Sequence, residues 1–266
     1  MIAEVYNRVS ATYDRDWNGI YRKSRAILID QVVAHCAPTL HSALDLCVGT
    51  GNAFADLEHH LHIGHRIGND ISPGMLRQAR RKLGPDFQTI CDDALNVDRH
   101  LPEASQDLVL CHFLFSFVDR EQLLHRAWRL LKPGGWLSIA TSTQGAFAEI
   151  YRDQFPWADK LLAVQANLAR SFTPANPQEL NLSVTRVGFE IIATHRYQEE
   201  TIFRSFRDIH DWAIDSGWAA QYFANAYWRK WLQTRLWFAV ARLIFYPLYP
   251  VVARNDIVLM LVRRPR

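Results

Sequence analysis

The chain has 266 residues with a formal net charge of +3 at pH 7, and 49% of its residues are hydrophobic. This length fits one large domain, or one domain with a substantial insertion, and the apolar content excludes a disordered chain. Arginine supplies most of the basic residues and is spread along the whole sequence. This spread disfavours a nucleic-acid-binding protein, whose basic residues usually gather on one face.

Four cysteines are far apart in the sequence and form no CxxC pair: Cys36, Cys47, Cys91 and Cys111. Most lie in or beside apolar runs, so we expect small core side chains in a reducing cytoplasm rather than disulfides. Apart from Glu58, the histidines of HHLHIGH lack acidic or cysteine partners, so we expect a solvated surface and no metal. The N-terminal sequence MIAEVYNRVSATYDRDW lacks the apolar core of a signal peptide.

Short apolar runs alternate with helical patterns through residue 142. The runs predict strands at 43–48, 66–71, 87–91, 107–112 and 136–141. Apolar residues spaced i, i+3, i+4 predict helices within FADLEHHL, PGMLRQARRKL and REQLLHRAWRLL, and KPGG predicts a helix end and a turn. Strands that alternate with helices favour an α/β fold with a parallel sheet covered on both faces.

The pattern changes after residue 142. A helix ends at Gly188 before a strand at about 189–198, and NDIVLMLVRR predicts a last strand at 255–264. The segment between these strands has a helical pattern with many aromatic residues. We therefore predict one Rossmann-like sheet with a helical, aromatic-rich cap inserted between its last two strands.

The most apolar segment of this cap, 236–252, is near the lower length limit for a membrane span. It carries Arg242 in its middle and is interrupted by Pro247 and Pro250. These features favour a buried or pocket-lining helix over stable membrane insertion. Contact of this segment with a membrane surface is left open.

Two glycines, Gly49 and Gly51, follow a predicted buried strand in the stretch DLCVGTGNAF. Glycines there let the backbone turn sharply and approach a ligand closely. A dinucleotide fingerprint requires a third glycine, where Phe54 stands, and a phosphate-binding P-loop requires a lysine that does not follow. The turn is expected beyond the carboxyl ends of the strands, where open parallel sheets bind ligands.

Asp70 ends the second predicted strand in GNDISPGML. A carboxylate at such a position can accept hydrogen bonds from both hydroxyls of a ribose. It can equally serve as an N-terminal carboxylate for the helix that starts near Pro73. The residues alone leave both interpretations open.

The chain resembles class I S-adenosylmethionine-dependent methyltransferases in five successive motifs: ALDLCVGTGNA, IGNDISPGML, CDDALNV, QDLVLCHFLFSFVD and RLLKPGGWLSIAT. The resemblance covers about residues 1–142 and extends weakly to the last two strands. It implies a seven-stranded, mostly parallel sheet with an antiparallel last strand, and S-adenosylmethionine as the cofactor. YNRVSATYD resembles the family's lid segment. We expect N-terminal lid helices at 1–40, the cofactor-binding domain at 41–202 and 254–266, and the cap at 203–253.

The resemblance also implies a set of cofactor-binding residues. The loop around the amino-acid part of the cofactor matches Asp45, Cys47, Gly49, Thr50 and Gly51. Asp70 matches the acidic residue that binds the ribose hydroxyls, and Ile71 and Met75 match the apolar residues around the adenine ring. Asp93 and Ala94 match the pair at the adenine edge, with Asp92 as the alternative carboxylate. Cys47 stands where the family often has the first glycine of D-x-G-x-G-x-G, and we expect its small side chain to be tolerated.

Two tyrosines of the lid segment, Tyr6 and Tyr13, are seven residues apart and would share one face of a helix. We expect Tyr13 to close over the cofactor and Tyr6 to face the substrate. Alternatively, both tyrosines fasten the helix to the sheet.

Methyl transfer from a sulfonium is an in-line displacement, which a protein promotes by alignment and by aromatic faces around the positive sulfur. The segment CHFLFSF supplies such faces in Phe113, expected at the cofactor, and Phe117, expected at the substrate. His112 is expected to contact the cofactor and is the candidate catalytic base for an amine, hydroxyl or thiol acceptor. Alternatively, His112 bonds a neighbouring group, and a thioether or tertiary amine acceptor needs no base.

The cap is expected to bind the substrate through Trp212, Trp218 and Tyr222, although the same side chains fit the core of the cap itself. We expect a cytoplasmic enzyme of secondary metabolism that methylates a small molecule and releases S-adenosylhomocysteine. No nucleic-acid partner is expected, and the oligomeric state is left open. One alternative is an intramolecular displacement on the cofactor that gives a cyclic amino acid and methylthioadenosine. Another is a cofactor-binding sensor without catalysis.

Overall fold

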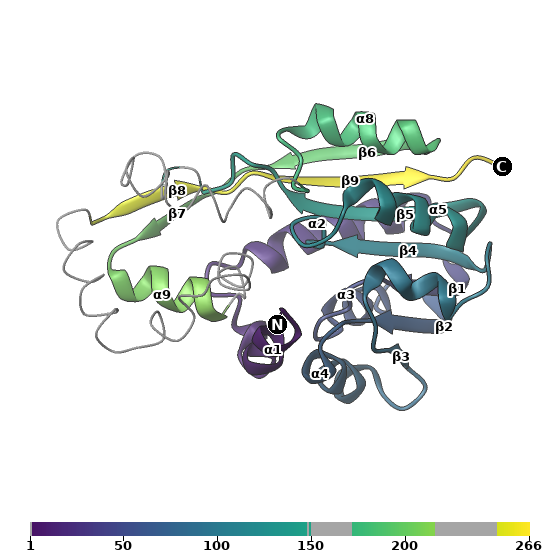
Figure 1. Ribbon diagram of the computed structural model, residues 1–266, viewed down its shortest axis with the longest axis horizontal. Coiled ribbons are helices and arrows are strands. Elements are labelled where there is room, and N and C mark those ends of the chain that lie inside the picture. The colour runs from purple at the N-terminus through teal and green to yellow at the C-terminus, as the bar shows by residue number, and fades with distance from the viewer. Residues whose placement is uncertain (1, 148, 150–171, 216–248) are drawn as a thin grey trace.

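A seven-stranded sheet forms the centre of the computed structural model, which describes residues 2–147, 149, 172–215 and 249–266 (Figure 1). In chain order its strands are β1 (Thr39–Asp45), β2 (His62–Asn69), β3 (Gln88–Ile90), β4 (Gln106–His112), β5 (Leu131–Ser142), β6 (Glu190–Tyr197) and β9 (Ile257–Arg263). Their order in the sheet is β3-β2-β1-β4-β5-β9-β6. β9 runs antiparallel to β5 and β6, and the remaining neighbours are parallel. The predicted Rossmann-like sheet with an antiparallel last strand is confirmed.

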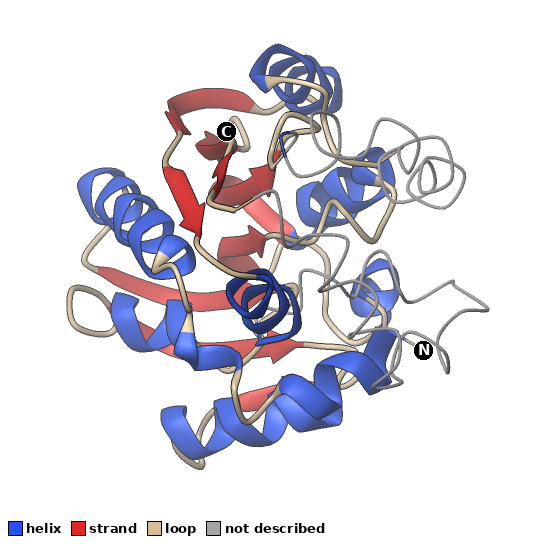
Figure 2. Cartoon of the chain, turned by 90° about the vertical axis from the view of Figure 1, so that its left-hand side faces the viewer, coloured by secondary structure: helices blue, strands red, loops and turns tan. Residues whose placement is uncertain are grey.

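Helices cover both faces of this sheet (Figure 2). One face packs against α2 (Ile20–His35), α3 (Asn52–Leu57) and α4 (Pro73–Leu83), and the other against η2 (Ala94–Arg99), α5 (Arg120–Leu130) and α8 (Pro177–Val187). The chain begins with α1 (Ile2–Val9) and the short turn η1 (Tyr13–Arg15). The central strands β1 and β4 are buried on both faces, which is typical of a parallel sheet between helical layers.

Several strands, β1 and β2 among them, begin earlier than the apolar runs predicted. β1 starts at Thr39 and β2 at His62, because the first residues of both strands are partly polar and exposed. Apolar patterning therefore detects only their buried carboxyl-terminal halves. Residues 132–135, where a turn was predicted, belong to β5. They form an irregularity in this strand, at which the register between β4 and β5 shifts.

Polar caps fix where the helices begin. Ser72 caps α4 by accepting the N–H of Met75, and Pro73 occupies the first position of the helix. Asp119 and Asn176 cap α5 and α8 in the same way. The caps of α4 and α5 lie beyond β2 and β4, at the edge of the sheet where ligands are expected.

A second sheet of two strands lies between β6 and β9 in the sequence. β7 (Glu200–Phe203) pairs antiparallel with β8 (Val251–Arg254), and α9 (Phe206–Asp215) follows β7. The sequence predicted a helical insert, and β8 differs from that prediction: the end of the apolar segment 236–252 is a strand whose alternate residues are buried. The central part of the insert, 216–248, lies outside the described residues.

No helix in the described ranges has an apolar stretch long enough to reach across a membrane. The described part of the chain also brings together no group of three or more histidine, cysteine, aspartate or glutamate side chains that would hold a metal ion. His62 and His65 lie on β2, and all four cysteines are free thiols.

Candidate cofactor and active site

Two glycines with left-handed backbone shape the turn after β1. Gly49 has a φ of 54° and Gly51 a φ of 86°. A β-carbon at Gly49 would lie 4.0 Å from Cε1 of Tyr13, so the tyrosine ring covers this part of the turn. A β-carbon at Gly51 would meet Cδ1 of Leu83 in α4 at 2.9 Å. Gly51 therefore serves the packing of helix on turn, whereas Gly49 faces the site.

Asp45 ends β1 beneath this turn, and its carboxylate accepts the N–H of Cys47 at 3.0 Å. Burial raises the pKa of Asp45 to about 7 against that hydrogen bond, and the nearby charge of Asp70 adds to the shift. The Cys47 thiol donates a hydrogen bond to the carbonyl oxygen of His112 at 3.3 Å. The thiol that replaces the family's glycine thus connects the turn to the end of β4.

Asp70 follows β2, and its residue is 9% exposed. Its two carboxylate oxygens accept the N–H of Ser72 at 2.8 Å and the N–H of Gly49 at 2.9 Å. Burial raises the pKa of Asp70 to about 6, although both hydrogen bonds oppose the shift. Because the Ser72 hydroxyl caps α4, Asp70 is not needed as the helix cap. Its carboxylate joins the glycine turn to the start of α4.

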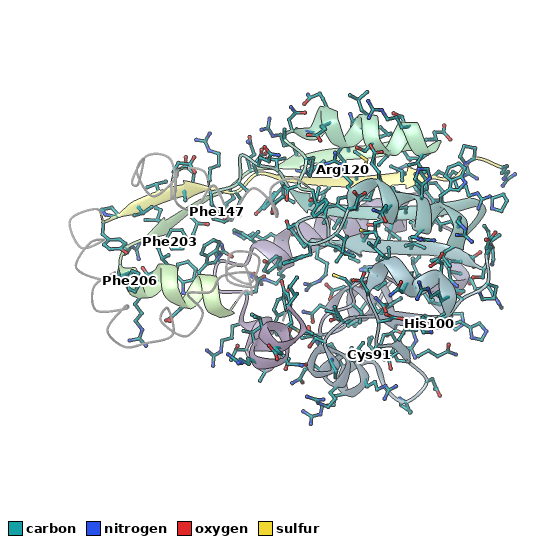
Figure 3. All side chains as sticks on the ribbon, viewed as in Figure 1. Cys91, His100, Arg120, Phe147, Phe203 and Phe206 are labelled. Carbon is teal, nitrogen blue, oxygen red and sulfur yellow. The ribbon has the colours of Figure 1, made fainter. Side chains whose placement is uncertain are left out.

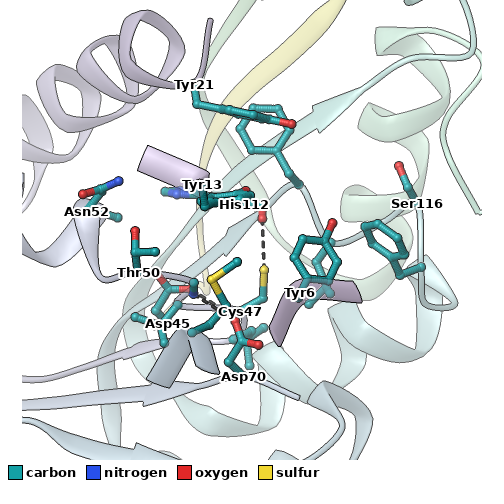
Figure 4. Close-up of a pocket in the computed structure, with 18 of the residues that line it drawn as sticks. Tyr6, Tyr13, Tyr21, Asp45, Cys47, Thr50, Asn52, Asp70, His112 and Ser116 are labelled. Carbon is teal, nitrogen blue, oxygen red and sulfur yellow. Dashed lines mark hydrogen bonds between the residues drawn. The ribbon is translucent and has the colours of Figure 1, made fainter. Parts of the chain in front are cut away.

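A cavity of about 460 Å³ lies at the carboxyl ends of β1, β2, β4 and β5 (Figure 4). This volume falls in the range of about 300–1,000 Å³ that is typical of small-molecule sites. Most of the predicted site residues line it: Tyr6, Tyr13, Asp45, Cys47, Gly49, Thr50, Asp70, Ile71, Met75, Asp93, Ala94, His112, Phe113 and Phe117. The structure thus brings together residues from four of the five motifs and from the lid segment.

Trp212, the predicted substrate residue of the cap that the structure describes, does not line this cavity. Trp212 is 3% exposed and packs in a core cluster against Phe147 and Phe203, with ring centroids 4.5 and 5.3 Å away (Figure 3). This is the alternative role that the sequence left open for it. Trp218 and Tyr222 lie outside the described residues.

Two neighbouring aspartates, Asp92 and Asp93, are candidates for the contact with the adenine edge. Asp92 accepts a hydrogen bond from His100 at 2.7 Å, which lowers the pKa of Asp92 to about 2. Asp93 caps η2 by accepting the N–H of Leu95 at 2.9 Å. Asp93 lines the cavity and Asp92 does not, so the geometry favours Asp93 over its neighbour.

Five aromatic rings follow one another along the cavity: Phe117, Tyr6, Tyr13, Tyr21 and Phe113. Neighbouring ring centroids lie 4.9–6.3 Å apart, and all pairs except Tyr13 and Tyr21 meet edge to face (Figure 4). Burial raises the pKa of Tyr6 and Tyr13 well above the usual value for a phenol, so both hydroxyls stay neutral. Tyr21 was missed in the sequence, because no motif marks its position at the start of α2.

His112 has a partner behind the cavity wall: its Nε2 lies 3.0 Å from Oγ of Ser138 on β5. Burial, assisted by the positive charge of Arg25, lowers the pKa of His112 to about 3. An imidazole with this pKa is a weak proton acceptor at neutral pH. The geometry favours the bonded-neighbour interpretation, and the role of His112 as a base stays a prediction.

Other cavity residues carried no signal in the sequence. Arg22 and Arg25 contribute from α2, and Ser142 and Thr143 from the end of β5. Ser142 ends β5 and Thr143 follows it, so both follow the same rule as Asp45 and Asp70 and stand at the same edge of the sheet. The α2 residues follow no such rule, because α2 precedes the first strand.

Comparison with known proteins agrees with this geometry. A family model described as "Methyltransferase domain" matches residues 43–135. The demethylmenaquinone methyltransferase of Deinococcus radiodurans is 33% identical over 160 residues, which cover 57% of this chain and 61% of that protein. The malonyl-(acyl-carrier protein) O-methyltransferase of Dechloromonas aromatica is 31% identical over 151 residues, which cover 56% and 53%. The chain thus spans somewhat more than half the length of these curated relatives.

Solved structures have a similar fold. The N-methyltransferase NodS of Bradyrhizobium japonicum, in complex with S-adenosylhomocysteine, superposes with a TM-score of 0.57 at 12% identity over 98% of this chain and 99% of that one. The YcgJ protein of Bacillus subtilis gives a TM-score of 0.58 at 14% identity over 92% and 99%. Motifs, relatives and fold agree: residues 43–135 match a methyltransferase domain, and the described part of the chain has the fold of class I S-adenosylmethionine-dependent methyltransferases.

Proposed function

We propose that the protein binds S-adenosylmethionine in this cavity and transfers its methyl group to a small molecule. The observation that carries the proposal is the convergence of Asp45, Asp70 and Gly49 at the cavity, with the Tyr13 ring over the turn. The Asp70 carboxylate stands at the carboxyl end of a strand, where an acidic residue suits ribose hydroxyls. A volume of about 460 Å³ is sufficient for a nucleoside with an amino-acid arm.

The residues beyond β2 and β3 suit a flat apolar ring such as adenine. Ile71 lines the cavity although it is 43% exposed, whereas Met75, one turn into α4, is buried. An exposed apolar side chain inside a cavity is stabilised when a ring covers it, by about 25 cal/mol per Å² removed from water. Asp93 and Ala94 line the cavity after β3 and would meet the edge of that ring.

S-adenosylmethionine supplies an activated methyl group when bound, and the chain's own side chains then align the acceptor and keep water out. Tyr6, Tyr13 and Tyr21 line the cavity where a positive sulfur would be stabilised by roughly 0.5–2 kcal/mol per ring. His112 is neutral at physiological pH and forms a hydrogen bond with the Ser138 hydroxyl. We infer an acceptor that needs no histidine base, because it arrives ionised or carries a free lone pair.

The small-molecule acceptor draws support from the relatives' names, which refer to demethylmenaquinone and to malonyl-(acyl-carrier protein). Four free thiols support a reducing compartment, which we propose to be the cytoplasm. A role in secondary metabolism and the lack of a nucleic-acid partner belong to the same proposal. So does the division into a lid at 1–40, a cofactor-binding domain at 41–202 and 254–266, and a cap at 203–253.

One experiment tests this function. The purified protein is incubated with S-adenosylmethionine, first alone and then with a small-molecule extract, a demethylmenaquinol or a malonyl thioester, and the products are identified by mass. We expect S-adenosylhomocysteine only when an acceptor is present. Formation of methylthioadenosine without an acceptor would show that the protein catalyses the intramolecular displacement and not methyl transfer. Binding without turnover under every condition would indicate a sensor.

A further inference from the structure

Asp14 joins the N-terminal segment to the cofactor turn. Its Oδ1 accepts hydrogen bonds from Oγ1 of Thr50 at 2.5 Å and from Nδ2 of Asn52 at 2.9 Å. Its Oδ2 accepts a hydrogen bond from Nζ of Lys82 at 2.8 Å. Thr50 belongs to the turn after β1, Asn52 begins α3, and Lys82 lies in the last turn of α4. A single carboxylate therefore connects this segment to three parts of the fold.

Tyr13 precedes Asp14 in η1 and lies over the cofactor turn. Its ring stacks on Tyr21 at a centroid distance of 5.9 Å and meets the edge of Tyr6 at 6.3 Å. Because Tyr13 and Asp14 share one short 3₁₀ turn, the hydrogen bonds of the carboxylate also fix where the tyrosine ring lies. The position of the ring over Gly49 thus depends on Asp14.

The segment has a second attachment at Asn7, on α1. The Asn7 Oδ1 accepts hydrogen bonds from Oγ of Ser72 at 2.8 Å and from the N–H of Gly74 at 2.6 Å, both at the start of α4. Tyr6 and Tyr13, which line the cavity, are each adjacent to one of the two attachments. The N-terminal segment is therefore fastened at both ends of its contact with the site.

The attachment at Asp14 is charged and partly open to solvent. Burial alone would raise the pKa of Asp14, but the hydrogen bonds from Lys82, Thr50 and Asn52 outweigh it and lower the pKa below the usual value. The carboxylate is therefore ionised at neutral pH, and its hydrogen bonds are charge-assisted. Its side chain is 46% exposed and that of Lys82 is 29% exposed, so salt screens the pair. Charge-assisted hydrogen bonds hold the N-terminal segment in place, and their exposure to solvent allows them to break and the segment to move away from the cavity.

We propose that Asp14 is a positioning residue that fastens Tyr13 over the cofactor turn, and that its release sets how fast the cofactor and its product enter and leave. This inference rests on the proposed function. Asp14, Thr50 and Asn52 line the cavity and Lys82 does not. Because every hydrogen bond of the Asp14 attachment joins two protein groups, we expect a bound cofactor to change the strength of the attachment little. Weakening the attachment then speeds entry and exit by the same factor and leaves the dissociation constant nearly unchanged. Loss of a direct contact with the cofactor would instead speed exit alone.

Stopped-flow fluorescence tests this by measuring the association and dissociation rates of S-adenosylhomocysteine. Asp14→Ala is expected to raise both rates roughly 5- to 10-fold, as the loss of charge-assisted hydrogen bonds implies. Lys82→Gln, a change outside the cavity, should raise both rates by a smaller factor. Asp86→Ala removes an exposed aspartate that does not line the cavity and is the matched control, with both rates unchanged. Hydrogen exchange of residues 2–15 should become faster in Asp14→Ala and stay the same in Asp86→Ala.

Unchanged rates in Asp14→Ala and Lys82→Gln would overturn the proposal, and so would a rise in the dissociation rate alone. If Asp14→Ala does not fold, Lys82→Gln still decides the outcome. If the wild-type protein does not bind S-adenosylhomocysteine, the proposed function fails on its own account. Hydrogen exchange of residues 2–15 then shows whether Asp14 fastens the segment, and unchanged exchange would overturn that part as well.

Discussion

Replacing Asp70 by asparagine is expected to weaken cofactor binding and yet stabilise the fold above pH 6. Burial raises the pKa of Asp70 from its usual 3.8 to about 6. The unfolded chain ionises near the usual value, so only the folded protein holds this proton between those two pH values. Stability therefore falls as pH rises through this window, and the ionised carboxylate destabilises the fold at pH 7. Asparagine does not ionise and escapes this loss.

The magnitude follows from the shift. Roughly two pKa units at about 1.36 kcal/mol per unit correspond to about 3 kcal/mol of unfolding free energy. Relative to wild type, Asp70→Asn should gain up to that amount between pH 3.5 and pH 7.5. A pH-independent cost reduces this gain in unfolding free energy. In asparagine an NH₂ group replaces one carboxylate oxygen, so one of the N–H groups of Ser72 and Gly49 loses its acceptor. Affinity for S-adenosylhomocysteine should fall roughly 10- to 100-fold, since charge-assisted hydrogen bonds to the ribose become neutral ones.

Urea denaturation at a series of pH values measures the difference in unfolding free energy between Asp70→Asn and wild type, and calorimetry measures affinity for S-adenosylhomocysteine at pH 7. Asp86→Asn, at an exposed aspartate that does not line the cavity, is the matched control. A difference for Asp70→Asn that stays constant from pH 4 to pH 8 would refute the burial argument. Unchanged affinity would refute the assignment of Asp70 to the ribose.

Three other outcomes are expected at the same cavity. Tyr13→Ala should weaken S-adenosylhomocysteine binding roughly 5- to 30-fold in calorimetry while Tyr13→Phe keeps it, because the ring rather than the hydroxyl covers Gly49. Because the pKa of His112 is near 3, the pH–rate profile of methyl transfer should show no ionisation near pH 6.5. An ionisation near pH 6.5 that disappears in His112→Gln would show that His112 is the catalytic base. Cys47→Gly should leave the affinity for S-adenosylhomocysteine within about threefold in calorimetry, because the change removes one weak thiol hydrogen bond to the carbonyl oxygen of His112.

The sheet and the cofactor edge were predictable because each rests on a local, repeated pattern. Buried parallel strands alternate with amphipathic helices. Asp45 and His112 end two of these strands, and Asp70 follows a third directly. Their side chains must therefore meet at one edge of the sheet. The starts of the strands were not predictable to the residue, because exposed polar positions give no apolar signal.

Other parts of the site depend on contacts between distant segments. β7 and β8 pair Glu200 with Arg254 across the whole insert, and short strands beside an aromatic helical pattern do not reveal such a pairing. Spacing alone gave Gly51 the same role as Gly49, although Gly51 faces Leu83 of α4. Tyr21 reaches the cavity because α2 packs against β5 and β9, which follow it in the chain, and tertiary packing of this kind gives no local signal.

The two buried carboxylates connect the shape of the turn to the choice of ligand. Asp45 accepts the N–H of Cys47, Asp70 accepts that of Gly49, and the charge of Asp70 makes Asp45 harder to ionise. A ligand with an extra positive charge relieves this repulsion, so its binding favours the ionised pair. S-adenosylmethionine carries the sulfonium charge and S-adenosylhomocysteine does not. Between pH 5.5 and pH 8, across the raised pKa values of about 6 and 7, affinity should therefore rise more steeply for the cofactor than for its product. Calorimetry over this range measures both slopes, and equal slopes would show that the pair does not distinguish the two ligands by charge.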